Sequence, residues 1–433
     1  MRISEVKVSL HSCPMEKPEI LPAWDSWRIV LNPTVAIARV VTDEGIIGYG
    51  MGEMGSFEVA RDIIAPTLKG EELEDIGDIE GIWRKIEKLV PDEETRNKAT
   101  GAIDVALWDA VGKASNKSIC ELLGGRRQDR IKVYASAGLI YRDPQRTIDE
   151  AKAFRDGEFG FTAYKYKTGQ GPVNDIRTAK LLRETLGDET VLMHDGHYFF
   201  CKSGHGDYMY QPRVVKWIAK ELEKLNVYWF EEPLPHQEVS LNKELKETLS
   251  TMLLATGESC ATLAEYEALL KNDACDIVQG EPAMFGGITQ CRKVIEMAEE
   301  YGKMFIPHNW GPRITAAANA QLCAAYPKSL IPWNEMSMFA TEGQPGLFRW
   351  PLVEEMLVRP LEIKNSYLKV PRGPGLGVEV SDKALGKYPY VDVPYNAYLY
   401  SVPTSYMPSY PTGYLPREYF GKEDIFRKSK YLW

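Results

Sequence analysis

Polar and apolar positions divide the first part of the chain into two kinds of element. Apolar and β-branched residues alternate or run together over residues 3–10 and 33–49, and the polar turn at 42–45 is a hairpin signal. From about residue 57 to 124, apolar and small residues recur at three- and four-residue steps, a spacing that predicts helices. The chain therefore begins with a predicted small antiparallel sheet, followed by helices.

A different rhythm begins after Arg126. Short apolar runs recur about every 30 residues, with a helical pattern in most gaps, which predicts right-handed βαβ units and a parallel sheet. The predicted strands lie near residues 132–137, 162–168, 191–195, 227–231, 252–258, 276–280, 303–308 and 330–335. Eight strands with no dinucleotide-binding fingerprint at the first favour a closed α/β barrel over an open doubly wound sheet.

The length of 433 residues fits a barrel of about 250 residues plus one smaller domain. We expect an N-terminal α+β domain at 1–128, the barrel at 129–370 and a C-terminal segment at 371–433. From Lys387 this segment is rich in proline and tyrosine, and so many aromatic residues argue against disorder. We expect it to lie over a folded surface or a neighbouring subunit.

Composition excludes several classes of function. The formal charge is −9 with scattered basic residues, so a nucleic-acid footprint is absent, and no run of about 18 apolar residues could span a membrane. The seven cysteines contain no CxxC pair, and the first eight residues do not resemble a signal peptide. We therefore expect reduced thiols and a cytoplasmic protein.

Two segments contain residue types typical of functional sites, a run of glycines and a pair of lysines. The run from Gly48 to Gly55 is predicted to be a glycine-rich turn without the features of a phosphate-binding loop. In the strand at 163–168, Lys165 and Lys167 alternate with tyrosines, so both ammonium groups lie on one face. Because each lysine makes protonation of the other more costly, one pKa is expected to fall towards the range of a base.

Acidic residues and one histidine follow at the ends of successive predicted strands. They are Asp195, Glu231, Glu232, Glu258, Glu281, His308 and Glu335. The C-terminal ends of barrel strands carry the active site, and carboxylates converging there suit a hard divalent cation, most naturally Mg2+. Zinc fits poorly, because there are no thiolate ligands or clustered histidines.

Taken together, the order and spacing of several short motifs resemble the enolase superfamily, specifically its mandelate racemase-like subgroup. The motifs are the helix at 102–109, Lys165-x-Lys167, Asp195-Gly-His197, Phe230-Glu-Glu-Pro233, Gly257-Glu258, Phe285-Gly-Gly287, Pro307-His308-Asn309 and Pro374-Gly-Leu-Gly-Val-Glu379. The resemblance implies an α+β capping domain, built from both termini, over a modified (β/α)7β TIM barrel.

The resemblance also implies roles at matching positions. Asp195, Glu231 and Glu258 match the Mg2+ ligands, with Glu232 in a supporting position. Lys167 matches a general base on one face of the substrate, and Lys165 is its electrostatic neighbour.

On the opposite face, His308 matches an acid/base group, and Glu281 stands where an aspartate usually orients that histidine. Glu335 matches an electrophile that hydrogen-bonds the substrate carboxylate, and it must be protonated to do so.

This chemistry removes a proton beside a carboxylate and forms an enediolate, which Mg2+ and Lys165 would stabilise. Our leading hypothesis is a hydro-lyase that dehydrates an acid sugar, an aldonate or aldarate, to a 2-keto-3-deoxy acid. Reprotonation of the enediolate on its other face would instead give a racemase or epimerase of a 2-hydroxy acid. A third hypothesis is a non-catalytic carboxylate-binding protein of the same fold.

The remaining candidates concern the substrate, a small-molecule carboxylate. His197 lies two residues after Asp195 and so faces the same way, and with His236 it suits a polyhydroxylated substrate. Trp24 and Arg28 lie on a long loop that we expect to act as a lid over the distal end of the sugar. We also expect a homo-oligomer.

Overall fold

The computed structural model describes residues 1–15, 28–139, 143–167, 171–197, 210–342, 345–393 and 396–398. The N-terminal sheet consists of β1 (Ile3–Ser12), β3 (Thr34–Thr42) and β4 (Ile47–Gly52), all antiparallel, in the order β1-β3-β4. The hairpin predicted at 42–45 joins β3 to β4. Residues 48–52, predicted to be part of a turn, instead form most of strand β4.

Helical segments follow the sheet, as predicted. They are η1 (Val59–Ile64), η2 (Ala65–Leu68), α1 (Ile76–Leu89), α2 (Glu93–Ala114) and α3 (Ile119–Leu122). Helix α2 begins after Asp92, whose carboxylate accepts a hydrogen bond from the backbone N–H of Thr95 (2.9 Å) and so caps the helix.

The glycines of β4 allow the strand to lie directly on helix α2. A Cβ atom on Gly48 would lie 2.0 Å from the backbone oxygen of Ala106, and one on Gly50 would lie 1.9 Å from that of Ala102. Since no other residue fits at such a distance, the glycine-rich run serves close packing. It fixes the end of β4 relative to α2.

The second part of the chain is a parallel barrel. Its strands are β5 (Arg130–Ser136), β6 (Ala163–Lys167), β7 (Val191–Asp195), β8 (Val227–Glu231), β9 (Leu253–Thr256), β10 (Ile277–Val278), β11 (Met304–Phe305) and β12 (Asn334–Ser337). Neighbours in sequence pair in parallel from β5 to β11, and β12 pairs with β5. A backbone hydrogen bond from Phe305 to Leu330 links β11 to the segment before β12.

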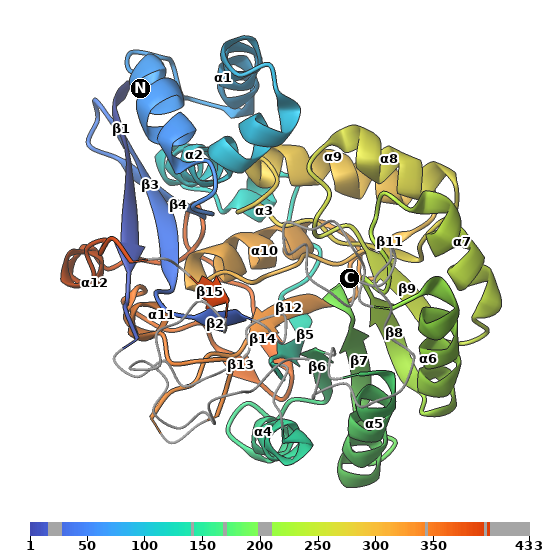
Figure 1. The fold of residues 1–433 in the computed structure, drawn as a ribbon. Helices are drawn as coiled ribbons and strands as arrows, with labels where there is room; N and C mark the ends of the chain where they lie inside the picture. The colour runs from blue at the N-terminus through green and yellow to red at the C-terminus, as the bar shows by residue number, and fades with distance from the viewer. Residues whose placement is uncertain are drawn as a thin grey trace.

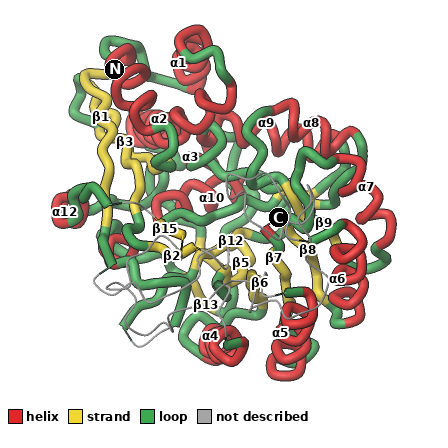
Figure 2. The backbone as a smooth tube through the Cα atoms, viewed as in Figure 1, coloured by secondary structure: helices red, strands yellow, loops and turns green. Residues whose placement is uncertain are grey.

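Among the described residues, one helix lies between each pair of successive strands. These helices are α4 (Pro144–Asp156), α5 (Pro172–Leu186), α6 (Pro212–Lys224), α7 (Val239–Thr248), α8 (Leu263–Lys271), α9 (Gly287–Glu300) and α10 (Arg313–Ala325). Figure 1 shows them around the strands, with the N-terminal sheet and α1 to α3 on one side, and Figure 2 shows the same arrangement as helices outside and strands inside. The predicted (β/α)7β barrel with an α+β capping region is confirmed.

Strand boundaries differ from prediction mainly at the end of the barrel. The last strand begins at Asn334, not near residue 330, because Pro332 has no N–H group to donate to a ladder. Inside the barrel, one small apolar cluster gathers side chains from all eight strands or the residues next to them. It contains Tyr134, Ala163, Met193, Trp229, Ala255, Ile277, Ile306 and Trp333.

After β12 the chain returns to the N-terminal sheet. Helix α11 (Pro351–Glu355), the hairpin of β13 (Ile363–Lys364) and β14 (Tyr367–Lys369), and helix α12 (Asp382–Lys387) come first, and then β15 (Asn396–Tyr398) pairs with β2 (Arg28–Val30). The side-chain amide of Asn32 donates to the carbonyl of Val391 (2.9 Å). Residues from 399 onward lie outside the described part, and the domain boundaries stay predictions. No helix among the described residues has the length and apolar composition to cross a membrane.

Candidate active site

Strand β6 points its lysines into the barrel mouth and its tyrosines towards the helices. The hydroxyl of Tyr164 donates to the carboxylate of Glu150 on α4 (2.6 Å), and the ring of Tyr166 packs edge-on against His194 (4.9 Å between centroids). Lys165 and Lys167 are both buried and contact carboxylates of neighbouring strands. The alternation predicted from the sequence therefore holds.

Three buried carboxylates converge at the ends of β7, β8 and β9. Asp195, Glu231 and Glu258 each offer an oxygen, and these atoms lie within 4.8 Å of one another. The Asp195 carboxylate also accepts a hydrogen bond from the backbone N–H of His197 (2.9 Å), and the Glu231 carboxylate accepts one from the indole of Trp229 (3.0 Å). These contacts hold the oxygens in place without using all of their lone pairs.

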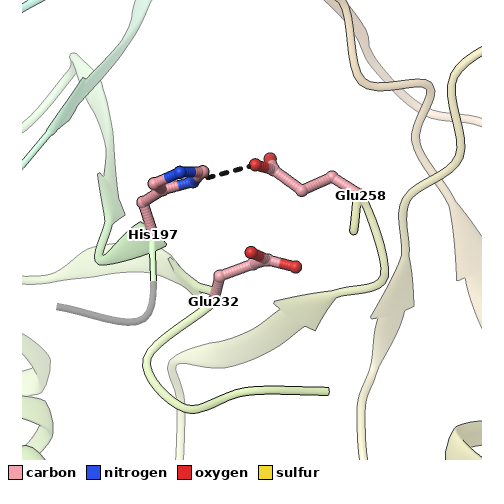
Figure 3. Close-up of side chains that lie close together, drawn as sticks. All are labelled: His197, Glu232 and Glu258. Atoms are coloured by element: carbon pink, nitrogen blue, oxygen red, sulfur yellow. Dashed lines mark hydrogen bonds and ion pairs between the residues drawn. The ribbon is translucent and has the colours of Figure 1, made fainter. Parts of the chain in front are cut away.

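A second group shares Glu258. His197, Glu232 and Glu258 also offer ligand atoms within 4.8 Å of one another, and the Nδ1 atom of His197 lies 3.1 Å from Glu258 (Figure 3). His197 and Glu232 have φ values of 37° and 40°. Such left-handed conformations are uncommon for non-glycine residues and tend to occur at functional sites.

Both lysines are paired with carboxylates. Lys165 bonds to Glu231 and lies 2.8 Å from Glu335, whereas Lys167 lies 2.5 Å from Asp195. Burial favours the neutral amine in each case, but these carboxylates outweigh it and raise the pKa of Lys165 and of Lys167 above their ordinary values. The expectation that the pKa of one lysine falls is therefore wrong when only the protein's own side chains act on it.

The acids at the mouth outnumber the bases that face them, and this imbalance suits a divalent cation. Burial raises the pKa of Glu231 to about 8, and the nearby Asp195 and Glu335 oppose the effect of Lys165. In contrast, the two lysines hold the pKa of Asp195 below its usual value in spite of burial. A cation bound to these oxygens would relieve the crowding of negative charge, so the residues fit a metal site.

His308 lies after β11 between two glutamates. Its Nδ1 atom is 2.6 Å from Glu281, and its Nε2 atom is 3.2 Å from Glu258. Burial works to lower the pKa of His308, but Glu258, Glu335 and Glu281 raise it to about 10. The longer side chain of Glu281 thus still reaches the imidazole, although an aspartate is usual at its position.

Glu335 at the start of β12 faces the same mouth. Its carboxylate accepts a hydrogen bond from the backbone N–H of Asn309 (2.9 Å) and pairs with Lys165. Burial alone would raise the pKa of Glu335, but Lys165 and His308 lower it below its ordinary value. The expectation of a protonated Glu335 is therefore wrong when only the protein's own side chains act on it, because the cations Lys165 and His308 face it.

A cavity of about 400 Å³ opens between the barrel mouth and the N-terminal sheet, which we also call the capping sheet. The predicted residues that line it are Lys167, His197, Glu258, Glu281 and His308. Glu53, at the end of β4, also lines it, although the sequence pattern did not indicate this residue. Its only signal was a single acid within a run of glycines and methionines.

Of the other predicted substrate-binding residues, the structure describes the side chain of His236 alone. His236 is buried and its Nε2 atom lies 3.2 Å from Glu265 of α8, and it is not among the described residues that line the cavity. Trp24 lies outside the described residues, as does the side chain of Arg28.

Comparisons with known proteins place the chain in a family. The family model described as "Enolase C-terminal domain-like" matches residues 146–384, and the one described as "Mandelate racemase / muconate lactonizing enzyme, N-terminal domain" matches residues 13–124.

Curated relatives and solved structures agree with these matches. The chain is 28% identical to the arabinonate dehydratase of Saccharolobus solfataricus, over 82% of this chain and 90% of the relative. It is also 28% identical to the L-talarate/galactarate dehydratase of Salmonella typhimurium, over 88% and 90%. The 3,6-anhydro-D-galactonate cycloisomerase of Zobellia galactanivorans has a similar structure, with a TM-score of 0.75 and 26% identity over 90% of this chain and 99% of that one. The family matches and the barrel architecture together show that this chain belongs to the enolase superfamily, in its mandelate racemase-like subgroup.

Proposed function

We propose that the protein is a Mg2+-dependent dehydratase that converts an acid sugar, an aldonate or aldarate, into a 2-keto-3-deoxy acid. The observation that carries the proposal is the presence of Lys167 and His308 on one cavity, beside the carboxylate group of Asp195, Glu231 and Glu258. A base, an acid and a cluster of metal-binding oxygens are what such an elimination needs. The names of several relatives support an acid sugar as the substrate.

The metal would be held by Asp195, Glu231 and Glu258. This all-oxygen set suits Mg2+ better than the alternative group that includes His197, because imidazole favours transition metals. When bound, Mg2+ would supply the positive charge that binds the substrate carboxylate and acidifies the neighbouring C–H.

Lys167 would remove the proton from C2. Burial and repulsion by Lys165 both lower the pKa of Lys167, but the nearby Asp195 outweighs them. If the Asp195 carboxylate also bound a cation, it would raise the pKa of Lys167 less. Lys167 would then be a better base. Lys165 would stay charged and stabilise the negative charge that develops on the substrate carboxylate.

His308 would give a proton to the hydroxyl that leaves C3. The hydroxyl and this proton leave as water, and the C2 proton stays on Lys167 as an ammonium. Glu281 accepts from Nδ1 and so directs Nε2 towards the cavity. Tautomerisation of the resulting enol then gives the 2-keto-3-deoxy acid.

The proposal is tested by proton NMR of the protein with Mg2+ in D2O, against a panel of aldonates and aldarates. We expect one acid to lose water and to give the spectrum of a 3-deoxy-2-keto acid. Lys167→Ala should abolish turnover, by roughly ten thousandfold or more, while the circular dichroism spectrum is unchanged. Lys180→Ala, which removes an exposed lysine on α5, is the matched control and should keep full activity.

Other outcomes point to the alternatives. Deuterium at C2 with inversion and no water loss would support a racemase or epimerase, for which the same two groups would serve. Metal binding without proton exchange on any acid would support a carboxylate-binding protein without catalysis. Unchanged activity of Lys167→Ala would contradict the assignment of the base.

A further inference from the structure

Glu53 enters the cavity from the capping sheet. It follows the last residue of β4, and its backbone N–H donates to the carbonyl of Ala283 in the loop after β10 (3.4 Å). A Cβ atom on Gly101 of α2 would lie 2.6 Å from the same carbonyl oxygen, so helix α2 packs directly on this loop. The end of β4 is thus held against the barrel, and the position of Glu53 follows from that packing.

The carboxyl group of Glu53 has no partner within the protein as far as the described residues go. No described donor lies within hydrogen-bond distance of it. Apart from the groups assigned to catalysis and metal binding, the described lining of the cavity is largely apolar, with Val35, Met51, Met54, Met284, Trp310 and Trp350. A partly buried polar group on such a wall gains most from a hydrogen bond to a ligand.

The backbone hydrogen bond to Ala283 places Glu53 beside the loop after β10, which also carries Glu281, the partner of His308. Burial raises the pKa of Glu53 to about 7, the carboxylate of Glu281 adds to this effect, and Lys98 and His308 oppose it. Glu53 therefore faces the part of a substrate that extends away from its metal-bound carboxylate.

The same lining disfavours a second negative charge at that end. Among the described residues that line the cavity, the cationic side chains Lys167 and His308 belong to the reacting centre, and both are already paired with carboxylates. A distal carboxylate would lie near Glu53 and Glu281, and like charges placed together at an interface are strongly unfavourable. Above about pH 7, where Glu53 is ionised, a neutral hydroxyl can instead donate to its carboxylate.

We propose that Glu53 determines specificity by accepting a hydrogen bond from a hydroxyl of the distal chain, and so selects monocarboxylate sugar acids over dicarboxylate ones. This inference rests on the proposed function, which leaves aldonates and aldarates equally open.

The test compares matched acids, gluconate with glucarate and galactonate with galactarate, on protein loaded with Mg2+. Binding is measured by calorimetry in the Lys167→Ala background, where no chemistry interferes, and turnover is measured with Lys167 intact. Glu53→Gln keeps the size of the side chain and removes its charge. Glu58→Gln changes an exposed acid in the same segment and is the matched control.

We expect each aldonate to bind at least about tenfold more tightly than its matched aldarate, and Glu53→Gln to reduce this ratio about tenfold or more, mainly by weakening the aldonate. Glu58→Gln should leave the ratio unchanged. Equal binding of the two classes, preference for the aldarate, or an unchanged ratio in Glu53→Gln would overturn the proposal. So would a variant that loses kcat with intact binding, because Glu53 would then be a proton donor.

The two proposals fail in different ways. If no acid is turned over by the protein with Lys167 intact, the proposed dehydratase function fails, but the binding ratio still decides whether Glu53 discriminates between the two classes. If turnover is found and the ratio does not respond to Glu53→Gln, only the specificity proposal fails.

Discussion

Among the regions of this protein that bury aspartate or glutamate, two treat the charge in opposite ways. At the interface between α2 and the barrel, Asp104 accepts from the indole of Trp83 (2.7 Å) and from the backbone N–H and the hydroxyl of Thr289. Every one of these donors is neutral. At the barrel mouth, Asp195 and Glu231 accept from one neutral donor each and also pair with lysines.

The difference shows what a buried acid can be used for. The interface acid lies on α2 and accepts from donors on two other helices, so its hydrogen bonds tie α1 and α9 to α2. The mouth acids crowd one another, as the raised pKa of Glu231 indicates, and their oxygens can accept a further cation. Burial is common to both regions, and the donors decide between a structural and a chemical role.

The largest effect is expected at the mouth. Asp195→Asn removes one charge from the metal-binding group, and we expect kcat/KM to fall roughly a thousandfold or more because the cation loses a ligand. Calorimetric titration with Mg2+ should show weakened binding, whereas the melting temperature should stay close to that of the unchanged protein. Normal metal affinity in this variant would remove Asp195 from the proposed ligand set.

Substitution of Asp104, the interface acid, should instead lower stability and leave metal affinity unchanged. Asp104→Ala leaves the buried indole of Trp83 and the N–H of Thr289 without an acceptor, and we expect it to lower the free energy of unfolding by about 3 kcal/mol. Urea denaturation measures this loss. Asp104→Asn keeps one acceptor oxygen and should lose less.

Magnesium affinity of the folded Asp104→Ala variant serves as the control. It should be unchanged, because the side chain lies away from the cavity lining that the structure describes. A large loss of affinity with little loss of stability would break the distinction between the two regions.

A smaller effect is expected at Glu281, where the charge acts through a histidine. His308 must be protonated to act as an acid, so its contribution is lost as pH rises through its pKa. Glu281 is one of three carboxylates that raise the pKa of His308 to about 10 against the effect of burial. Glu281→Gln should therefore lower that pKa and move the alkaline limb of the kcat/KM profile to lower pH, with roughly a tenfold loss on that limb.

Glu281→Asp keeps the charge and provides the comparison. It should leave the alkaline limb nearer its original position even if the rate falls, because the shorter side chain still carries a carboxylate. If both variants shift the limb equally, the hydrogen-bond geometry at Nδ1 outweighs the charge of Glu281.

The sequence by itself determined the architecture and the chemical character of the mouth. Strand and helix periods are local, so the alternation after Arg126 indicated eight strands, and the period of two in β6 indicated that Lys165 and Lys167 share a face. Acids at strand ends could be located in the same way, because a parallel barrel brings those ends together.

Only the tertiary structure decided which groups meet. His236 contacts Glu265 and does not line the cavity. Glu53 reaches the cavity because the glycines of β4 let this strand pack against α2. The lysine pKa values rise because carboxylates from neighbouring strands outweigh burial and, at Lys167, the repulsion by Lys165. Contacts of this kind join residues far apart in the chain, and their distances determine the energies, which local patterns do not contain.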